Sequence, residues 1–405
     1  MAINNKLRIS RRNSKSAGRF FTLIASLFTL ATSLSVTSCI EPPLKLPAEE
    51  VMVDLPIVIT DLEVVWDIDA NWHSRWYYGW DATDIKHWGQ IAYPMPSSYE
   101  VRRYYLGQKP SVPHTTVDGF PLFTNSFTKA WSFGYHDMLI WSNIDSDDGS
   151  QVVLIDETDL NEVTASTTGT RGISSILSRG EEESPVVGLF NQPEIFYSAY
   201  PQNIFISRNY EDYDYYDEKK NVWVKRINCT LRPLVYIYLV QIIIYDNDGR
   251  ITGVNGNNAV SGFASTTSVN TGHTGNKPCM VYYQSRMKKD LEAKGRRADI
   301  IGGKLTTYGL CDMPPYTRGQ TAQYTGTRTD LKNILYFDLT FSNGTEKTME
   351  ADITSQCQAQ SHGGVITIEL NAKDIEMPQP EDKGDGSLFV PTVEDYDEVV
   401  WDITI

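Results

Sequence analysis

Residues 232–245 read RPLVYIYLVQIIIY, the longest run of β-branched and aromatic residues in this 405-residue chain. Residues of these types favour strands. The run ends in Asp-Asn-Asp-Gly at residues 246–249, a combination typical of a hairpin turn. The stretch therefore predicts a strand that is followed by a tight hairpin turn.

Shorter stretches with strand character lie on both sides of this run, several with the alternation of a half-buried strand. Residues 285–294 are the best helix candidate, and Asn343-Gly344 is the clearest tight-turn dipeptide. The other predicted strands are residues 62–68, 98–106, 137–143, 151–155, 300–310, 334–342 and 364–370. Many short strands without alternating helical blocks predict an all-β fold of antiparallel sandwiches.

The chain is longer than one sandwich core comfortably supports. An acidic, tyrosine-rich stretch at residues 209–221 is predicted to be a loop and is the best candidate for a domain boundary. It predicts two tandem β-sandwich domains, at residues 57–220 and 221–376. Residues 377–405 are then a linker rich in proline, glycine and acidic residues, followed by a C-terminal strand.

Residues 1–38 have the composition of an export signal, with six basic and no acidic residues and an apolar stretch at residues 20–36. Small residues directly precede Cys39, an arrangement that resembles the bacterial lipobox, in which cleavage leaves the cysteine as an acylated first residue. An ordinary secretory signal and an uncleaved membrane anchor are the alternatives. Residues 39–56 contain four prolines and predict a tether.

The charge of the chain excludes two classes of partner. The full sequence has a formal net charge of −15. Removal of the export signal leaves 30 Lys and Arg against 51 Asp and Glu, a net charge of about −21. Such a surface repels nucleic acid and anionic lipid headgroups, so membrane attachment must come from a lipid on Cys39.

Besides Cys39, the chain has four cysteines, all in its second half. Disulfides are permitted in an oxidising compartment, and free, buried thiols are an equal alternative. Four cysteines allow three pairings, and the sequence does not choose between them. These cysteines are Cys229, Cys279, Cys311 and Cys357.

No catalytic motif is found, and the six histidines are scattered. Residues 145–149 and 246–249 each match part of a calcium loop, but both lack the bidentate glutamate and lie where turns are expected. The cysteines and histidines lack zinc-ligand spacing. The sequence therefore predicts no enzymatic activity, no cofactor and no metal site.

Aromatic residues crowd residues 72–88, namely Trp72, Trp76, Tyr77, Tyr78, Trp80 and Trp88. Exposed Trp and Tyr side chains stack on sugar rings and anchor protein interfaces. Trp72, Trp76, Tyr77 and Trp80 are therefore candidates for binding a glycan or a host protein. The alternative, favoured here, is that most of these side chains fill the core of the first sandwich, because Trp is highly buried on average.

Several segments together resemble the fimbrillin-like lipoproteins of Bacteroidota, which supply the anchors, shafts and tips of type V pili. They are Cys39 with its preceding residues, VVWDIDANW (64–72), GYHDMLIWSN (134–143), QPEIFYS (192–198), residues 228–251, AVSGFAS (259–265), LTTYGL (305–310), residues 335–356 and GGVITIEL (363–370). The resemblance implies two tandem transthyretin-like β-sandwiches, lipoprotein export and no enzymatic activity. It also implies an outer-membrane location and other fimbrial subunits as partners.

The hexapeptide EVVWDI occurs at residues 63–68 and again at residues 398–403. Identical side chains at period two could occupy one groove in one register. The terminal strand of one molecule could then replace the first strand of another by β-strand addition. The candidates for this exchange are Val64, Trp66 and Ile68 in the first copy and Val399, Trp401 and Ile403 in the second.

In the family that the chain resembles, shaft subunits lose their first strand to an Arg-directed protease, whereas anchor subunits keep both strand and lipid. Arg75 follows the first copy, on a turn expected to be exposed, and is the candidate for processing. The alternative is that the two copies are ordinary edge strands, each paired within its own chain. The prediction is a lipid-anchored, cell-surface anchor or accessory subunit of a pilus-like fibre.

Overall fold

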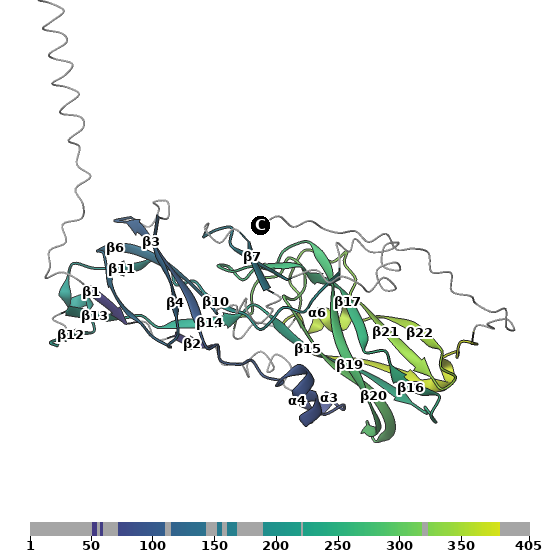
Figure 1. Ribbon diagram of the computed structural model, residues 1–405. Helices are drawn as coiled ribbons and strands as arrows, with labels where there is room; N and C mark the ends of the chain where they lie inside the picture. The colour runs from purple at the N-terminus through teal and green to yellow at the C-terminus, as the bar shows by residue number, and fades with distance from the viewer. Residues whose placement is uncertain are drawn as a thin grey trace, which may run out of the picture.

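The computed structural model describes residues 51–54, 57–59, 72–109, 115–142, 152–155, 160–167, 189–219, 222–317 and 323–380. Most of these residues lie in strands, and the helices are short. The all-β fold predicted from the sequence is confirmed. Figure 1 shows the strands in two lobes that lie side by side along the molecule.

The first lobe contains two sheets, and strands from distant parts of the chain meet in both. The four-stranded sheet has the order β12 (Tyr215–Asp217), β13 (Val222–Arg226), β1 (Val51–Asp54) and β5 (Thr128–Trp131). The seven-stranded sheet has the order β2 (Ile57–Ile59), β14 (Cys229–Pro233), β10 (Tyr197–Ala199), β6 (Gly134–Ser142), β3 (Tyr99–Gly107) and β4 (Thr115–Leu122), and β11 (Ile204–Ile206) also pairs with β6.

The second lobe is built on a nine-stranded sheet. Its order is β16 (Ile251–Val254), β21 (Ile334–Phe341), β17 (Asn257–Ala264), β19 (Pro278–Ala293), β20 (Arg296–Thr307), β15 (Tyr236–Tyr245) and β23 (Gly364–Asn371), with β22 (Glu346–Asp352) on β21 and β9 (Leu189–Phe190) on β19. The first half of β19 pairs with β17 and its second half with β20, so one long strand joins the two parts of the sheet.

A small third sheet combines both parts of the chain. Its order is β18 (Thr266–Ser268), β8 (Thr164–Thr167) and β7 (Val152–Ile155). The main hydrophobic core is also shared, because Val101 and Met138 of the first lobe belong to the same buried cluster as Tyr238 and Ile301 of the second. The lobes therefore share one core.

Strand β15 is the centre of the second lobe, and all ten of its residues are buried. The predicted strand at residues 232–245 is confirmed, although its first two residues belong to β14. The predicted hairpin is wrong. The turn at residues 246–249 leads to β16, which pairs with β21, because β15 already has β20 on one side and β23 on the other.

Three further predictions need correction. Residues 285–294, predicted as a helix, lie almost entirely in β19, where antiparallel pairing with β20 overrides their helical propensity. The predicted tether includes β1, whose residues form a proline-free stretch between Pro47 and Pro56. The predicted loop at residues 209–221 contains β12. By contrast, the predicted turn at Asn343-Gly344 is confirmed, since it joins β21 to β22.

The domain boundary between residues 220 and 221 stays a prediction. Strands β13 and β14, which follow it, pair with strands of the first lobe. These two strands therefore belong to the first lobe, whereas β9, which precedes the division, pairs with β19 of the second lobe.

Cys229, Cys279, Cys311 and Cys357 are buried and free. Of the two alternatives that the sequence leaves open, the structure has free thiols. Burial raises the pKa of both the Cys229 and the Cys311 thiols to about 12, which keeps them protonated and unreactive at neutral pH.

Candidate functional site

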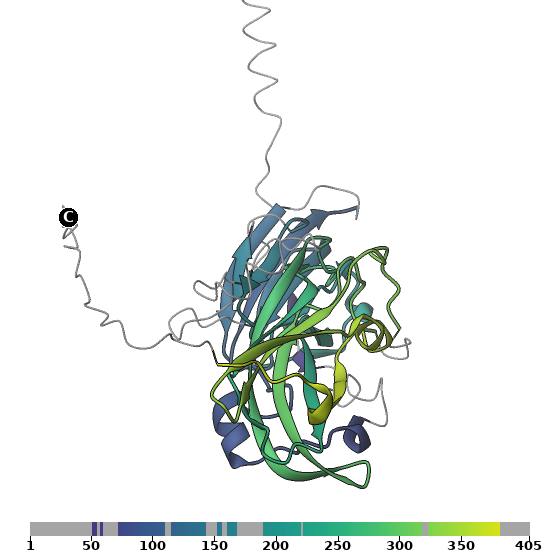
Figure 2. The same cartoon turned by 90° about the vertical axis from the view of Figure 1, so that its right-hand side faces the viewer.

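Residues 72–88, called here the aromatic segment, contain the helices α3 (Trp72–Arg75) and α4 (Ala82–Trp88). The segment lies in the chain between β2 and β3 of the first lobe, yet it packs against the second lobe. Figures 1 and 2 show its helices beside the lower ends of β19 and β20. The prediction that these aromatic side chains fill the core of the first sandwich is therefore wrong.

Tyr78 is the buried centre of the aromatic segment. Its side chain is 2% exposed and packs with Ile243 of β15 and Ile300 of β20. A Cβ atom on Gly302 would lie 2.3 Å from Cγ of the Tyr78 ring. The absence of a side chain at Gly302 is therefore what lets the ring lie against the sheet.

Asp84 connects α4 to β19 through charge. Its carboxylate is fully buried and accepts hydrogen bonds from Lys288 Nζ at 2.6 Å and Tyr78 Oη at 3.1 Å. Arg286 Nη1 lies 3.3 Å away. The same carboxylate completes a capping box with Asp81 at the start of α4. A buried carboxylate needs such partners, so Asp84 fixes both the helix and its position on the sheet.

Gln241 of β15 binds the backbone of the aromatic segment. This glutamine is fully buried, accepts a hydrogen bond from Tyr77 N at 2.9 Å and donates one to Arg75 O at 2.6 Å. Its Nε2 also donates to Thr367 Oγ1 at 2.9 Å. One side-chain amide thus attaches the aromatic segment to both β15 and β23.

The outer edge of β23 is covered by side chains of α6 (Thr354–Ala359) and the residue after it. Gln356 exchanges two hydrogen bonds of 2.9 Å with the N–H and C=O of Thr367. Gln360 does the same with Val365, at 2.9 and 3.0 Å. The two glutamines replace a neighbouring strand at these positions, which blunts an edge that could otherwise pair with another chain.

Arg75 is not on an exposed turn, as the sequence predicts. It ends α3, is half-buried, and donates from Nη2 to Oε1 of Gln360 at 2.8 Å. The correction has a plain cause, since Gln241 of the second lobe binds the carbonyl of Arg75 itself and the N–H of Tyr77, two residues further on. Processing after Arg75 stays a prediction.

The four aromatic residues predicted to bind a ligand are all half-buried. The indole N–H of Trp76 donates to Gly79 O at 3.0 Å, and that of Trp80 donates to Gly89 O at 3.1 Å. The Trp80 ring lies 6.4 Å from Trp76 and 5.3 Å from Trp88, measured between centroids. Their rings therefore contact one another and the sheet, and ligand binding by Trp72, Trp76, Tyr77 and Trp80 stays a prediction.

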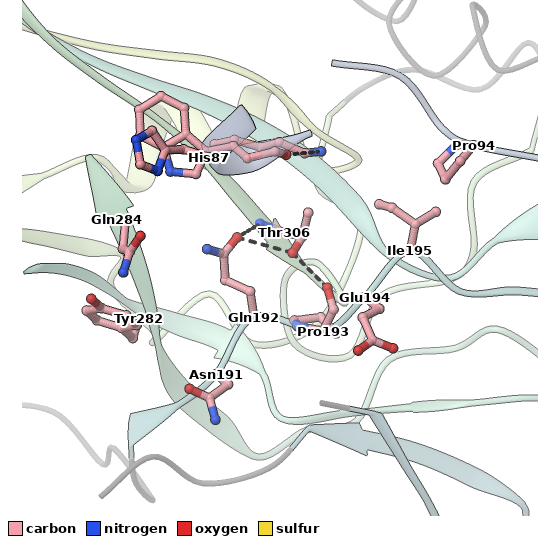
Figure 3. A pocket seen from close by; sticks show the side chains of 12 residues that line it. His87, Pro94, Asn191, Gln192, Pro193, Glu194, Ile195, Tyr282, Gln284 and Thr306 are labelled. Atoms are coloured by element: carbon pink, nitrogen blue, oxygen red, sulfur yellow. Dashed lines mark hydrogen bonds between the residues drawn. The ribbon is translucent and has the colours of Figure 1, made fainter. Parts of the chain in front are cut away.

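A pocket of about 570 Å³ opens beside the C-terminal end of α4. Five separate parts of the chain line it, as Figure 3 shows for most of its residues. They are His87 and Trp88, Pro94, residues 191–195, and the strand residues Tyr282, Gln284, Lys304 and Thr306. Apart from Trp88, none of these residues stands out in the sequence, because only the fold brings the five parts together.

The other predicted site residues, Cys39, Val64, Trp66, Ile68, Val399, Trp401 and Ile403, lie outside the described residues. Within the described ranges, no group of three or more His, Cys, Asp or Glu side chains is arranged to hold a metal ion. None of the helices in those ranges is long and apolar enough to span a membrane.

The chain is similar to solved structures of an adhesin and of two fimbrial proteins. For a candidate adhesin from Bacteroides ovatus the identity is 13% and the TM-score 0.45, covering 85% of this chain and 99% of the other. For the fimbrial anchor protein Mfa2 from Porphyromonas gingivalis the identity is 12% and the TM-score 0.38, and the match covers 80% of this chain and 90% of the other. For the tip fimbrial protein Mfa3 from the same organism the identity is 11% and the TM-score 0.26, and the match covers 64% of this chain and 77% of the other.

No protein-family model and no curated protein sequence matches the chain. Adhesins and fimbrial proteins are the kind of structure that the resemblance to fimbrillin-like proteins leads one to expect. With identities and TM-scores this low, the role of the chain must rest on its own residues.

Proposed function

We propose that the protein is a lipid-anchored structural subunit of a surface fibre, in the position of an anchor or accessory subunit. Its lipid is attached to Cys39, and it joins neighbouring subunits by β-strand addition. The observation that carries this proposal is the position of β1. Val51, where β1 begins, follows Cys39 by 12 positions, and β1 pairs with β13 on one side and β5 on the other.

This arrangement suits an anchor for two reasons. Because β1 is hydrogen-bonded on both sides, it connects the first lobe firmly to the proposed lipid on Cys39. A chain that keeps its own N-terminal strands in both sheets of the first lobe also has those positions filled. In the family that the chain resembles, anchor subunits keep both their first strand and their lipid.

Neighbouring subunits would pair at strands with an open side. Among the described strands, β4, β7 and β12 each pair on one side only. They carry exposed apolar or aromatic side chains, including Val117, Val153 and Tyr215. Edges of this kind accept strands from other chains.

The test is the intact mass and N-terminal peptide of the native protein, compared between washed outer membrane and sheared fibre material. The proposal expects acylated Cys39 in the membrane fraction, and expects a Cys39→Ser variant to leave that fraction. Unmodified Cys39 in a soluble fraction would overturn the lipid anchor. An N-terminus at Trp76 in the fibre fraction would instead make the protein a processed shaft subunit.

A second function, glycan or host-protein binding by the aromatic segment, is not favoured by the positions of Trp76 and Trp80. Their indole N–H groups are already bonded, and their rings contact other rings. The pocket beside Trp88 offers a different place for such binding.

A further inference from the structure

We propose that the pocket beside Trp88 binds a neutral carbohydrate. Its volume of about 570 Å³ falls in the range of small-molecule sites. It lies where α4, residues 191–195 and the strands β19 and β20 meet. This proposal is independent of the fibre function, because it concerns a ligand and not a neighbouring subunit.

Amide side chains give the pocket its chemical character. Asn191, Gln192 and Gln284 all line it, and an amide carries both a donor and an acceptor, as a sugar hydroxyl does. Oε1 of Gln192 accepts hydrogen bonds from Thr306 N at 2.8 Å and Thr306 Oγ1 at 3.2 Å. Figure 3 shows that the Gln192 amide nitrogen therefore points away from Thr306, toward the side where Gln284 lies.

The aromatic residues of the pocket provide apolar surface for a sugar ring. Trp88 and Tyr282 are half-buried on two different walls, and His87 is exposed at the end of α4. The faces of such rings pack against the C–H groups of a pyranose. Amides together with aromatic faces match a ligand that is polar at its edges and apolar on its faces.

The charges of the pocket argue against an anionic ligand. Its one lysine, Lys304, turns its ammonium group to the end of α4, donating to Gln90 O at 2.9 Å and Trp88 O at 3.3 Å. Burial lowers the pKa of Lys304 to about 8, so the ammonium is still mainly protonated at pH 7, but its charge faces these two carbonyl oxygens. Glu194, also on the wall, is exposed and would repel a phosphate, sulfate or carboxylate.

The test uses the full chain, purified in detergent, and isothermal titration calorimetry with neutral oligosaccharides of glucose, mannose and xylose. A galacturonic acid oligosaccharide is the anionic comparison. The variants are Gln284→Ala, which changes an exposed side chain, and Tyr282→Ala. Gln108→Ala, an exposed glutamine of the first lobe, is the matched control. Circular dichroism of each variant checks that the fold is kept.

The proposal expects at least one neutral oligosaccharide to bind, with a Kd about tenfold higher for Gln284→Ala and Tyr282→Ala and unchanged for Gln108→Ala. Three results would overturn it. The first is that no neutral oligosaccharide binds at about 10 mM, a concentration that detects even weak sites. The second is binding that both pocket variants retain, and the third is a preference for the anionic oligosaccharide.

Discussion

The ring of Tyr78 lies against Gly302 so closely that a single methyl group on the glycine would overlap it. Cβ at position 302 would be 2.3 Å from Cγ of Tyr78, although the two residues are far apart in the sequence. Gly302 is therefore the position on the second lobe against which the aromatic segment packs through Tyr78.

A Gly302→Ala substitution should loosen the aromatic segment. Overpacking of a buried contact costs about 1–3 kcal/mol in free energy of unfolding. Urea denaturation measures this cost, and limited trypsin digestion should cut faster after Arg75 because α3 is no longer held. The control is Gly253→Ala, in strand β16, where an added Cβ meets nothing within 4 Å. Equal stability of the two variants would show that the packing of Tyr78 does not require a glycine at position 302.

An Asp84→Asn substitution should lower the free energy of unfolding by about 2–3 kcal/mol, because it leaves the half-buried Lys288 and Arg286 without the buried carboxylate that they contact. Lys288 keeps Asp81 at 2.8 Å, which limits the loss. The control is Asp290→Asn, which removes an exposed ion pair with Arg297 and should change nothing measurable. The two variants are compared by thermal and urea unfolding.

Replacement of the glutamines that cover β23 should expose its edge. In a Gln356→Ala, Gln360→Ala double variant, the amide protons of Val365 and Thr367 lose their acceptors. Hydrogen exchange at these two amides should accelerate, and the double variant should self-associate as protein concentration rises. Gln358→Ala, on the same helix, is the control. Unchanged protection of Val365 and Thr367 would mean that the glutamines do not cover this edge in solution.

Acidification should destabilise the protein through His362. Its ring is 3% exposed and lies between Tyr236 and Tyr316, and burial lowers its pKa to about 4 from an ordinary value of 6.5. Folding thus favours the neutral ring, so its full stability is present above pH 6.5 and falls as the pH drops from 6.5 to 4. The loss is about 3 kcal/mol.

A His362→Gln variant isolates this effect, because it removes the titrating group and leaves the carboxylates. Its free energy of unfolding should fall less than that of the parent chain between pH 6.5 and 4. The exposed His73 supplies the control variant, His73→Gln. Identical pH profiles for the parent chain and His362→Gln would contradict the prediction.

Local pattern in the sequence predicts strands well and their neighbours poorly. The run at residues 232–245 gives β15, and Asn343-Gly344 gives the turn between β21 and β22, because alternation and turn chemistry are local properties. The partner of a strand depends on which positions are already filled. The turn after β15 leads away from it for that reason, and residues 285–294 become a strand because β20 lies beside them.

The same limit applies to the candidate sites. Composition drew attention to Trp72–Trp88. No local pattern, however, predicts that Tyr78 packs on a glycine of β20 or that Gln241 of β15 binds the backbone of this segment. The pocket is even harder to predict, because nothing in the sequence distinguishes Gln192 and Gln284 from other polar residues and only the fold brings them together. Long-range contacts of this kind have no signature in a single sequence.

The position of β1 also has a mechanical consequence. Three residue pairs join it to β13 and four join it to β5, one set on each flank. A tensile load applied along the chain before Val51 would strain both flanks in shear, so these bonds would have to rupture together and not one after another. Strand β2 and the aromatic segment come later in the chain and would be shielded from the load until β1 slips. The order of the chain thus sets the order in which the protein would yield to force.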